Sequence, residues 1–301
     1  MQVILGLVWF ADGALQLQPS MFGRGFVTGV LLPTTTGNPG PVAGSISAMA
    51  HFLEPHIAVW NVLFAATQIL IGLGLLVRRT VRPALAVSFA WSLAVWWFAE
   101  GLGGLLTGTA SPLSGAPGAV LLYVLIGLSV WPRPEQDHDR AAAVSGGLLG
   151  DAGARAAWAL LWVGSAALLL QPANLAAGAP RAVISGAEAG QPAWLADPLS
   201  NIARALGSHG TPLTVGLAAV MAVVGVGVAL GWHDGALLGL SVLLALAIWV
   251  VGEGLGGVLT GTGTDPNTGP LLALTAFALY RRGARQGVTR ATAPVAARKA
   301  N

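Results

Sequence analysis

Long apolar runs separated by short polar or basic turns dominate the pattern of this chain. A helix that rises about 1.5 Å per residue needs about 20 residues to cross the hydrocarbon core of a bilayer, and eight runs approach or reach that length. They lie at residues 2–18, 55–77, 83–106, 117–132, 154–171, 210–231, 235–259 and 268–281. The pattern predicts an all-α, polytopic membrane protein with eight transmembrane helices.

The composition supports a lipid environment and excludes several other classes of protein. Charged residues make up 9% of the chain, against about 25% in an ordinary soluble domain, and hydrophobic residues make up 54%. The net charge is only +3, and no basic patch carries interleaved aromatic residues, so nucleic acid is not a predicted partner. The chain has no cysteine, which excludes disulfides and thiolate chemistry within it. The predicted partner is the lipid bilayer.

The distribution of basic residues predicts the orientation. If both termini are cytoplasmic, 12 of the 15 Arg and Lys residues fall on the inner side, and only Arg24, Arg181 and Arg204 fall outside. Cytoplasmic loops carry this excess in multi-pass proteins. We therefore expect a multi-pass protein of the cell membrane, of the bacterial plasma-membrane type, with both termini in the cytoplasm.

The sequence repeats itself at an offset of 153 residues without a gap. The matched positions are Trp9 and Trp162, Gln18-Pro19 and Gln171-Pro172, His56 and His209, Gly72 and Gly225, Gly74 and Gly227, and Glu100 and Glu253. The repeat predicts two parallel four-helix units, 1–133 and 154–281, related by a pseudo-twofold axis along the membrane normal. A polar cytoplasmic linker, 134–153, joins them, and a basic cytoplasmic tail, 282–301, is predicted to be disordered.

Each predicted unit has a long outer excursion between its first two helices, at 19–54 and 172–208. Each excursion ends in a short stretch with apolar residues at helical spacing, "SISAMAHFL" and "PLSNIARAL". Such amphipathic stretches are typical of helices that lie in the membrane interface.

The order of these elements resembles a known family. A first helix reading "LGLVWFADGALQL" is followed by an external loop and then by "GLGLLVRRTVRPALAV", which crosses a basic turn into the next helix. This plan resembles the DoxX-like membrane family, here as a tandem duplication, although the second half has "GWHDGALLG" in place of the basic turn. The resemblance implies four-helix membrane units that include a subunit of a thiosulfate:quinone oxidoreductase and accessory partners of redox enzymes. It maps no catalytic residue onto this chain.

A glutamate and a glycine cluster occur at the same place in both halves. The segments read "WWFAEGLGGLLTGT" and "WVVGEGLGGVLTGT", and residues 97–109 match 250–262 at nine of 13 positions. An ionised carboxylate costs about 2.5–3.5 kcal/mol at the centre of a spanning helix and therefore needs a partner, a wet cavity or a proton. We expect Glu100 and Glu253 to face the bundle at the outer level, either as a ligand or proton site or as a hydrogen-bonded brace.

The glycines beside them allow two interpretations. Gly104 and Gly108, like Gly257 and Gly261, have the GxxxG spacing of close helix contacts. Glycine also allows a helix to end early and expose backbone amides. The candidate pocket-forming residues are Trp96, Trp249, Gly101, Gly103, Gly104, Gly254, Gly256 and Gly257. The two tryptophans are either the wall of a pocket for a quinone-sized ring or members of the interfacial aromatic belt.

His56, His209 and Asp12 complete the candidate ligand or proton site at the outer level. Each histidine either pairs with the glutamate of its own unit or forms an ordinary interfacial hydrogen bond. A metal site in the first half would have to recruit His51, Glu54 and Asp12, and no metal is assigned. Asp265 and Asn267 have no acidic or amide counterpart at the same offset, which argues against a cation-binding loop.

The function predicted first is that of an accessory or anchor subunit of a membrane redox process, with a site for a quinone or a proton at the outer leaflet and a membrane or periplasmic redox partner. The chain has no phosphate loop, dinucleotide fingerprint, HExxH or haem-attachment motif, so enzyme activity stays open. Two alternatives are a proton- or cation-coupled transporter that uses the paired glutamates and a structural membrane scaffold.

Overall fold

The computed structural model describes residues 1–132, 147–232 and 235–291, with side chains described up to Leu279. The regular secondary structure of this part of the chain is helical, and no strand occurs in it. The longer helices are α1 (Gln2–Leu15), α3 (Gly40–Leu53), α4 (Ile57–Leu76), α5 (Val81–Phe98), α6 (Ala119–Val130), α7 (Gly150–Leu169), α10 (Ala193–Leu206), α11 (Gly210–Ala229), α12 (Gly235–Ala247) and α13 (Thr268–Ala291). The shorter ones are α2 (Arg24–Phe26), α8 (Pro172–Leu175) and α9 (Ala179–Glu188). The all-α prediction is confirmed.

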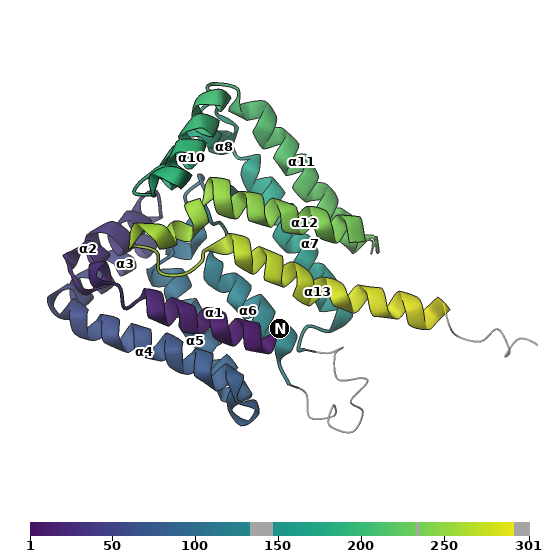
Figure 1. Ribbon diagram of the computed structural model, residues 1–301, viewed down its shortest axis with the longest axis horizontal. Coiled ribbons are helices and arrows are strands. Elements are labelled where there is room, and N and C mark those ends of the chain that lie inside the picture. The colour runs from purple at the N-terminus through teal and green to yellow at the C-terminus, as the bar shows by residue number, and fades with distance from the viewer. Residues whose placement is uncertain (133–146, 233–234, 292–301) are drawn as a thin grey trace, which may run out of the picture.

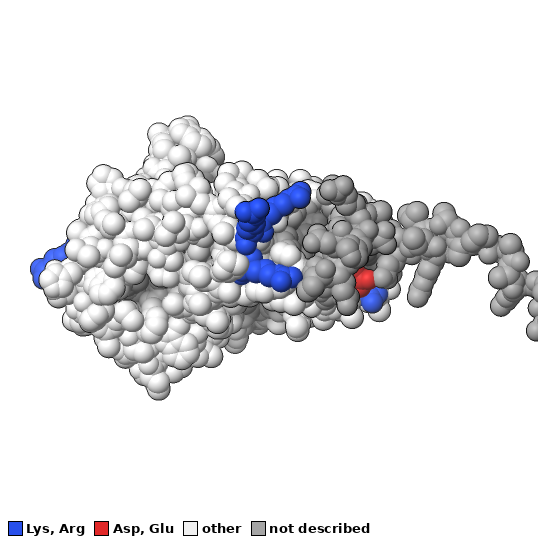
Figure 2. All heavy atoms as spheres, turned by 90° about the horizontal axis from the view of Figure 1, so that it is seen from below, with Lys and Arg blue, Asp and Glu red and all other residues white. Residues whose placement is uncertain are grey.

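Five helical stretches in the described residues are long and apolar enough to cross a membrane. They are Gly40–Leu76, Arg78–Phe98, Gly150–Leu169, Gly210–Ala229 and Gly235–Gly252, and three shorter apolar helices cover Gln2–Leu15, Ala119–Val130 and Thr268–Leu279. Large apolar side chains on these helices face outward, among them Leu160 and Leu243, which are 75% and 67% exposed. Figure 2 shows a face with a broad uncharged area between separate groups of Lys and Arg. These are the properties of a membrane protein.

Several helix bounds recur at the offset found in the sequence. Helices α4 and α11 both have 20 residues and begin at Ile57 and Gly210, and α3 and α10 both have 14 residues and begin at Gly40 and Ala193. In Figure 1 the N-terminus and the far end of α13 lie toward the right, opposite α2, α3, α8 and α10. We call the end that carries α3 and α10 the outer end, after the orientation that the sequence predicts.

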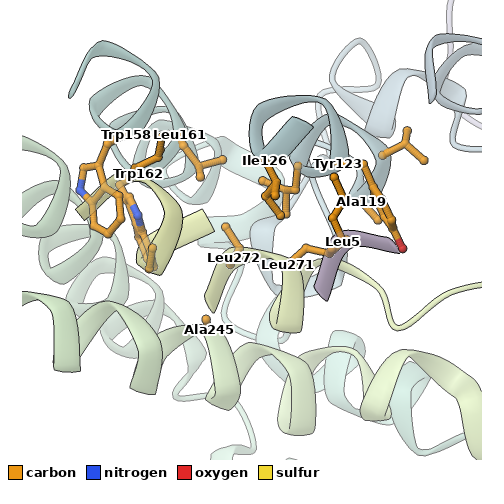
Figure 3. Close-up of a cluster of buried hydrophobic side chains, with 14 of the residues drawn as sticks. Leu5, Ala119, Tyr123, Ile126, Trp158, Leu161, Trp162, Ala245, Leu271 and Leu272 are labelled. Carbon is orange, nitrogen blue, oxygen red and sulfur yellow. The ribbon is translucent and has the colours of Figure 1, made fainter. Parts of the chain in front are cut away.

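The buried core joins both halves of the sequence. Helix α1 packs along α4 and α7 along α11, while α13 contacts α6, α7 and α12. Figure 3 shows Leu271 and Leu272 of α13 among Leu5, Tyr123 and Ile126, with Ala245 of α12 nearby. The close crossing of α1 and α4 depends on Gly72, where an added Cβ would lie 2.7 Å from the carbonyl oxygen of Gly6.

Three predicted boundaries differ from the structure. The spans at 83–106 and 235–259 are too long, because α5 ends at Phe98 and the π-helical turn that extends α12 ends at Gly252. The tail predicted to be disordered begins as helix, since α13 continues to Ala291. Residues 292–301 and most of the predicted linker, 133–146, lie outside the described residues.

The amphipathic outer stretches are helical, as predicted, and are longer than the quoted segments. Ile46 of α3 and Leu199 of α10 are each 1% exposed, so these helices are anchored on the protein itself. Leu53 of α3 packs with Phe26 and Ile57 in a cluster that covers the outer ends of α4 and α5. This packing places aromatic residues of α3 and α4 beside the segment that contains Glu100.

Candidate functional site

The chain breaks out of helical geometry directly after each glutamate. Leu102 and Leu255 have φ values of 59° and 58°, and the glycines on either side also have positive φ. An added Cβ on Gly103 would lie 2.0 Å from the carbonyl oxygen of Pro117, and one on Gly256 would lie 2.6 Å from that of Pro266. Glycine is therefore needed here so that one backbone can pass against another.

This geometry decides between the two interpretations of the glycines. The GxxxG interpretation is wrong, because Gly104, Gly108, Gly257 and Gly261 all have positive φ and do not form one face of a helix. Gly108 has no heavy atom within 4 Å of an added Cβ. The early helix end is the correct interpretation.

Glu100 and Glu253 both point to the start of the following helix, but their bonding differs. Val120 N–H donates to Glu100 Oε1 over 3.3 Å, and Glu100 Oε2 is buried without a hydrogen-bond partner among the described residues. Glu253 is 7% exposed, and both its oxygens accept: Oε1 from the Thr268 hydroxyl and Oε2 from Gly269 N–H over 3.0 Å. Both face protein, as expected, yet only Glu100 keeps an unused acceptor.

A cavity of about 370 Å³ opens beside Glu100, and we call it the aromatic chamber. Its polar lining consists of Asp12, Gln16, Gln68, Glu100, Tyr123, Thr264 and Asp265, and its aromatic lining also includes Trp9, Phe26, Phe52, Trp60, Phe64, Trp91 and Phe98. The rings of Phe52, Trp60, Phe64 and Trp91 follow one another with centroid separations of 5.3, 6.4 and 5.5 Å. The volume suits a small ring-containing molecule.

Asp12 lies in the chamber with a single partner. Its side chain is 2% exposed, and the Tyr123 hydroxyl donates to Oδ2 over 2.5 Å. The indole ring of Trp9 packs on Tyr123 with a centroid separation of 4.4 Å, which fixes the phenol. The second oxygen, Oδ1, has no partner in the described part of the chain. Asp12, predicted as part of a ligand or proton site, therefore lines the chamber with one carboxyl oxygen unused.

Asp265 is the residue that sequence reasoning missed. It contributes to the lining of the aromatic chamber although it belongs to the second half of the chain. Asn267 N–H donates to its Oδ1 over 2.7 Å and the Thr264 hydroxyl to its Oδ2 over 2.9 Å, which holds the carboxyl in the loop before α13. Burial raises the pKa of Asp265 above its usual range.

A shift in the repeat explains why Asp265 was missed. At an offset of 153 it corresponds to Pro112, but the carbonyls that approach Gly103 and Gly256 come from Pro117 and Pro266, an offset of 149. The second loop is four residues shorter, so Asp265 corresponds to Ala116. Realigning the two sequences on their shared prolines would have revealed the acid.

Two further cavities meet at the same residue. A polar cavity of about 470 Å³, which we call the vestibule, is lined by hydroxyl and amide groups such as Thr34, Asn38 and Thr107, and by Glu100 and Asp265. A third cavity, of about 280 Å³, lies beside Glu253 and includes Asp265 and Asn267. Asp265 therefore lines all three cavities, and its charge acts on Asp12, Glu100 and Glu253.

The structure does not bring the predicted histidines to this site. The side chains of His56 and His209 are exposed, and neither lines any of these three cavities. Across the described ranges there is no group of three or more His, Cys, Asp or Glu side chains that could hold a metal ion. The pairing of each histidine with a glutamate is therefore not supported.

The predicted pocket tryptophans also lie outside the lining of these cavities. Trp96 Nε1–H donates to the Pro117 carbonyl over 2.9 Å and fixes the loop before α6. Trp249 packs against Gly269: an added Cβ on Gly269 would lie 2.2 Å from the Cβ of Trp249. Of the predicted glycines, Gly103 and Gly104 line the vestibule, and Gly256 and Gly257 line the cavity beside Glu253.

No family model, curated protein or solved structure matches this chain. The DoxX-like resemblance therefore stays a prediction, and the functional argument rests on the geometry of the aromatic chamber.

Proposed function

We propose that the protein is a multi-pass membrane protein of two four-helix repeats, with eight spans and cytoplasmic termini, that binds a small amphipathic molecule at its outer end. The recurrence of helix bounds in α3, α4, α10 and α11 supports the repeat. The three shorter apolar helices would complete the eight spans together with the five longer stretches.

The observation that carries this proposal is the aromatic chamber itself. Its rings bind an apolar body, and Asp12, Glu100 and Asp265 supply polar groups at one place in the lining. Pockets for small molecules typically combine a mainly apolar wall with a few convergent polar groups. A purely structural brace would have both glutamates fully hydrogen-bonded, as Glu253 is.

A quinone is the ligand that the redox role favours. Trp9 Nε1–H and Trp91 Nε1–H are buried without hydrogen-bond partners in the described ranges and belong to residues that line the chamber. An indole N–H can donate to a quinone carbonyl. In this role the chain holds the quinone, and a membrane or periplasmic redox partner carries out the electron transfer.

A proton- or cation-coupled transporter is the second candidate function. It is favoured by the position of Glu100 and Asp265, which line both the polar vestibule and the aromatic chamber. Carboxyl groups between a wet and a dry compartment are suited to exchanging protons. Flux of protons into liposomes that contain the purified protein, lost in a Glu100→Gln variant, would favour this function.

Equilibrium dialysis of the detergent-purified protein against radiolabelled menadione, a small quinone, tests ligand binding. We expect saturable binding that is weakened when both Trp60 and Trp91 are replaced by Leu, the residue at positions 213 and 244 of the second half. Trp232→Leu is the matched control, because Trp232 is 55% exposed and does not line the chamber. Binding that is absent, or equally weakened by Trp232→Leu, would contradict the proposal for this ligand.

A further inference from the structure

Three buried hydrogen-bond acceptors in the lining of the aromatic chamber are unused. Asp12 Oδ1, Glu100 Oε2 and Gln68 Oε1 are buried and have no hydrogen-bond partner within the described residues. Asp12 is 2% exposed and Gln68 8% exposed, so solvent does not reach them freely. Buried acceptors of this kind are normally paired, and those without a protein partner point to a ligand that donates.

The charge of the chamber is also one-sided. Asp12, Glu100 and Asp265 line it, and the described lining residues include no Lys, Arg or His. The ion pair recorded in the described residues, between Arg24 Nε and Glu54 Oε1 over 2.9 Å, involves neither a lining residue nor any of these three acids. Buried carboxyl groups are either protonated or paired with a cation. Because no cationic side chain lines the chamber in the described residues, a cationic ligand is the partner that would keep these carboxyl groups ionised.

The aromatic walls favour a cation over an equally sized neutral group. A positive charge is attracted to the face of an indole, phenol or benzene ring, and the attraction grows when water is excluded. Trp60, Phe64 and Trp91 supply such faces in a continuous row of rings. The charged group and the apolar body of one ligand would therefore both be accommodated.

We infer that the aromatic chamber binds a protonated organic amine, with its ammonium group at Asp12, Glu100 and Asp265 and its apolar, ring-sized body among the aromatic side chains. The inference rests on the proposed small-molecule binding and replaces the quinone with a different class of ligand. An ammonium group has three N–H donors and a positive charge, whereas an oxidised quinone carries only acceptors. The amine thus offers donors to the unpaired oxygens of Asp12 and Glu100, and a positive charge to Asp265, whose own oxygens already accept hydrogen bonds.

The test compares three probes of similar apolar size by equilibrium dialysis near neutral pH. They are 4-phenylbutylamine, which is protonated under these conditions, its neutral analogue 4-phenylbutanol, and menadione. We expect the amine to bind at least about tenfold more tightly than the alcohol, because the alcohol lacks the charge. Menadione should bind more weakly than the amine.

Two variants with one control locate the amine. Asp265→Asn keeps the size of the side chain and should weaken amine binding by about tenfold while leaving alcohol binding unchanged. Trp60→Leu should weaken the binding of both the amine and the alcohol, since it removes an aromatic ring from the chamber wall. Glu253→Gln is the matched control, because Glu253 does not line the chamber and already has both oxygens paired.

Each other outcome has a definite meaning. If the alcohol or menadione binds as tightly as the amine, the amine inference is wrong and the proposed binding function stands. If no probe binds, both the inference and the proposed function fail. If the amine binds the wild type, Asp265→Asn and Glu253→Gln proteins equally, it is partitioning into the apolar surface and the inference is overturned.

Discussion

The two glutamate sites share a backbone and differ in chemistry. In both segments the chain leaves helical geometry after the glutamate and passes through a leucine with a positive φ, Leu102 or Leu255. In both, a glycine two residues further on from the first glycine packs directly against a proline carbonyl. Glu253 accepts from two donors of α13, one at each oxygen. Glu100 accepts from Val120 N–H at Oε1, keeps Oε2 unpaired and has the chamber beside it. The shared glycine block therefore reflects the needs of the backbone, and it does not by itself mark two equivalent binding sites.

The chamber lies beside Glu100, with no counterpart of the same chemistry beside Glu253, because most of its lining residues differ between the halves. The pairs of corresponding residues are Asp12 and Ser165, Phe52 and Ala205, Trp60 and Leu213, Phe64 and Leu217, Gln68 and Met221, Trp91 and Leu244, and, at the shorter offset, Tyr123 and Leu272. In six of these seven pairs the second half has an apolar side chain, and in the remaining pair it has Ser165 in place of the carboxyl of Asp12. The second half contributes instead the one acid, Asp265, that the first half lacks at that point.

Substitution of the threading glycines should have the largest effect, and the same effect in both halves. Gly103→Ala and Gly256→Ala each force a Cβ against a backbone carbonyl at a positive φ, so we expect each to cost at least about 4 kcal/mol of stability. Gly108→Ala is the control, since its φ is 72° but the space around it is open, and it should cost only about 1–2 kcal/mol. Thermal unfolding in detergent measures all three. If Gly103→Ala lowers stability no more than Gly108→Ala does, the close contact between Gly103 and the Pro117 carbonyl is contradicted.

Replacing each glutamate by glutamine should separate the two sites. Glu253→Gln removes one of two charge-assisted acceptors and should lower stability by about 2 kcal/mol without changing ligand binding. Glu100→Gln should lower stability less and weaken binding of the amine probe by about tenfold. Unfolding and equilibrium dialysis on both variants give the comparison. Identical behaviour of the two variants would show that the sites are equivalent after all.

The Asp12–Tyr123 pair offers a smaller test within the first half. Tyr123→Phe removes the hydroxyl that donates to Asp12 Oδ2 and should destabilise the fold by about 1–3 kcal/mol. Adding Asp12→Ser, which introduces the residue found at position 165, should recover about 1 kcal/mol because no unpaired carboxyl remains. A double-mutant cycle of unfolding free energies measures this coupling. Additive effects would mean that the two side chains do not interact.

The pH dependence of stability gives the smallest expected effect. Burial raises the pKa of Asp265, so the folded chain holds this proton more tightly than the unfolded chain does. The contribution of Asp265 to stability is then fully present below its unfolded pKa and is lost as the pH rises through the folded pKa. Asn cannot titrate, so the stability of Asp265→Asn relative to wild type should rise as the pH is raised. The rise should be about 1 kcal/mol for each unit by which the folded pKa of Asp265 exceeds its unfolded pKa. Melting temperatures of both proteins from about pH 4 to about pH 8 check the sign.

Much of the fold was predictable because its signals are local. Apolar runs of sufficient length gave the helices, and the repeated positions of Glu100 and Glu253 gave their common place after a membrane helix. The end of α5 at Phe98 could not be predicted, because the sequence alone did not show whether the following glycines form a helix contact or end the helix. His56 lies in the short 3-10 turn between α3 and α4, and its side chain is exposed.

The chamber could not be predicted, because it is made by contacts between distant segments. The packing of α3 brings Phe52 to Trp60 and so builds a wall that no spacing reveals. Asp265 lines the site from the loop before α13, which is four residues shorter than its counterpart. That difference was visible in the sequence, but its meaning depended on knowing which carbonyl each glycine faces.

Photoaffinity labelling with a diazirine-bearing phenylalkylamine tests the central claim, that one composite chamber binds a ligand with the help of both halves. The account predicts labelled peptides from α4 or α5 and from the 264–265 loop, with labelling suppressed by unlabelled 4-phenylbutylamine and reduced in Asp265→Asn. Labelling that falls around Glu253 with equal strength, or that is spread over the lipid-facing helices and is not suppressed, would contradict it.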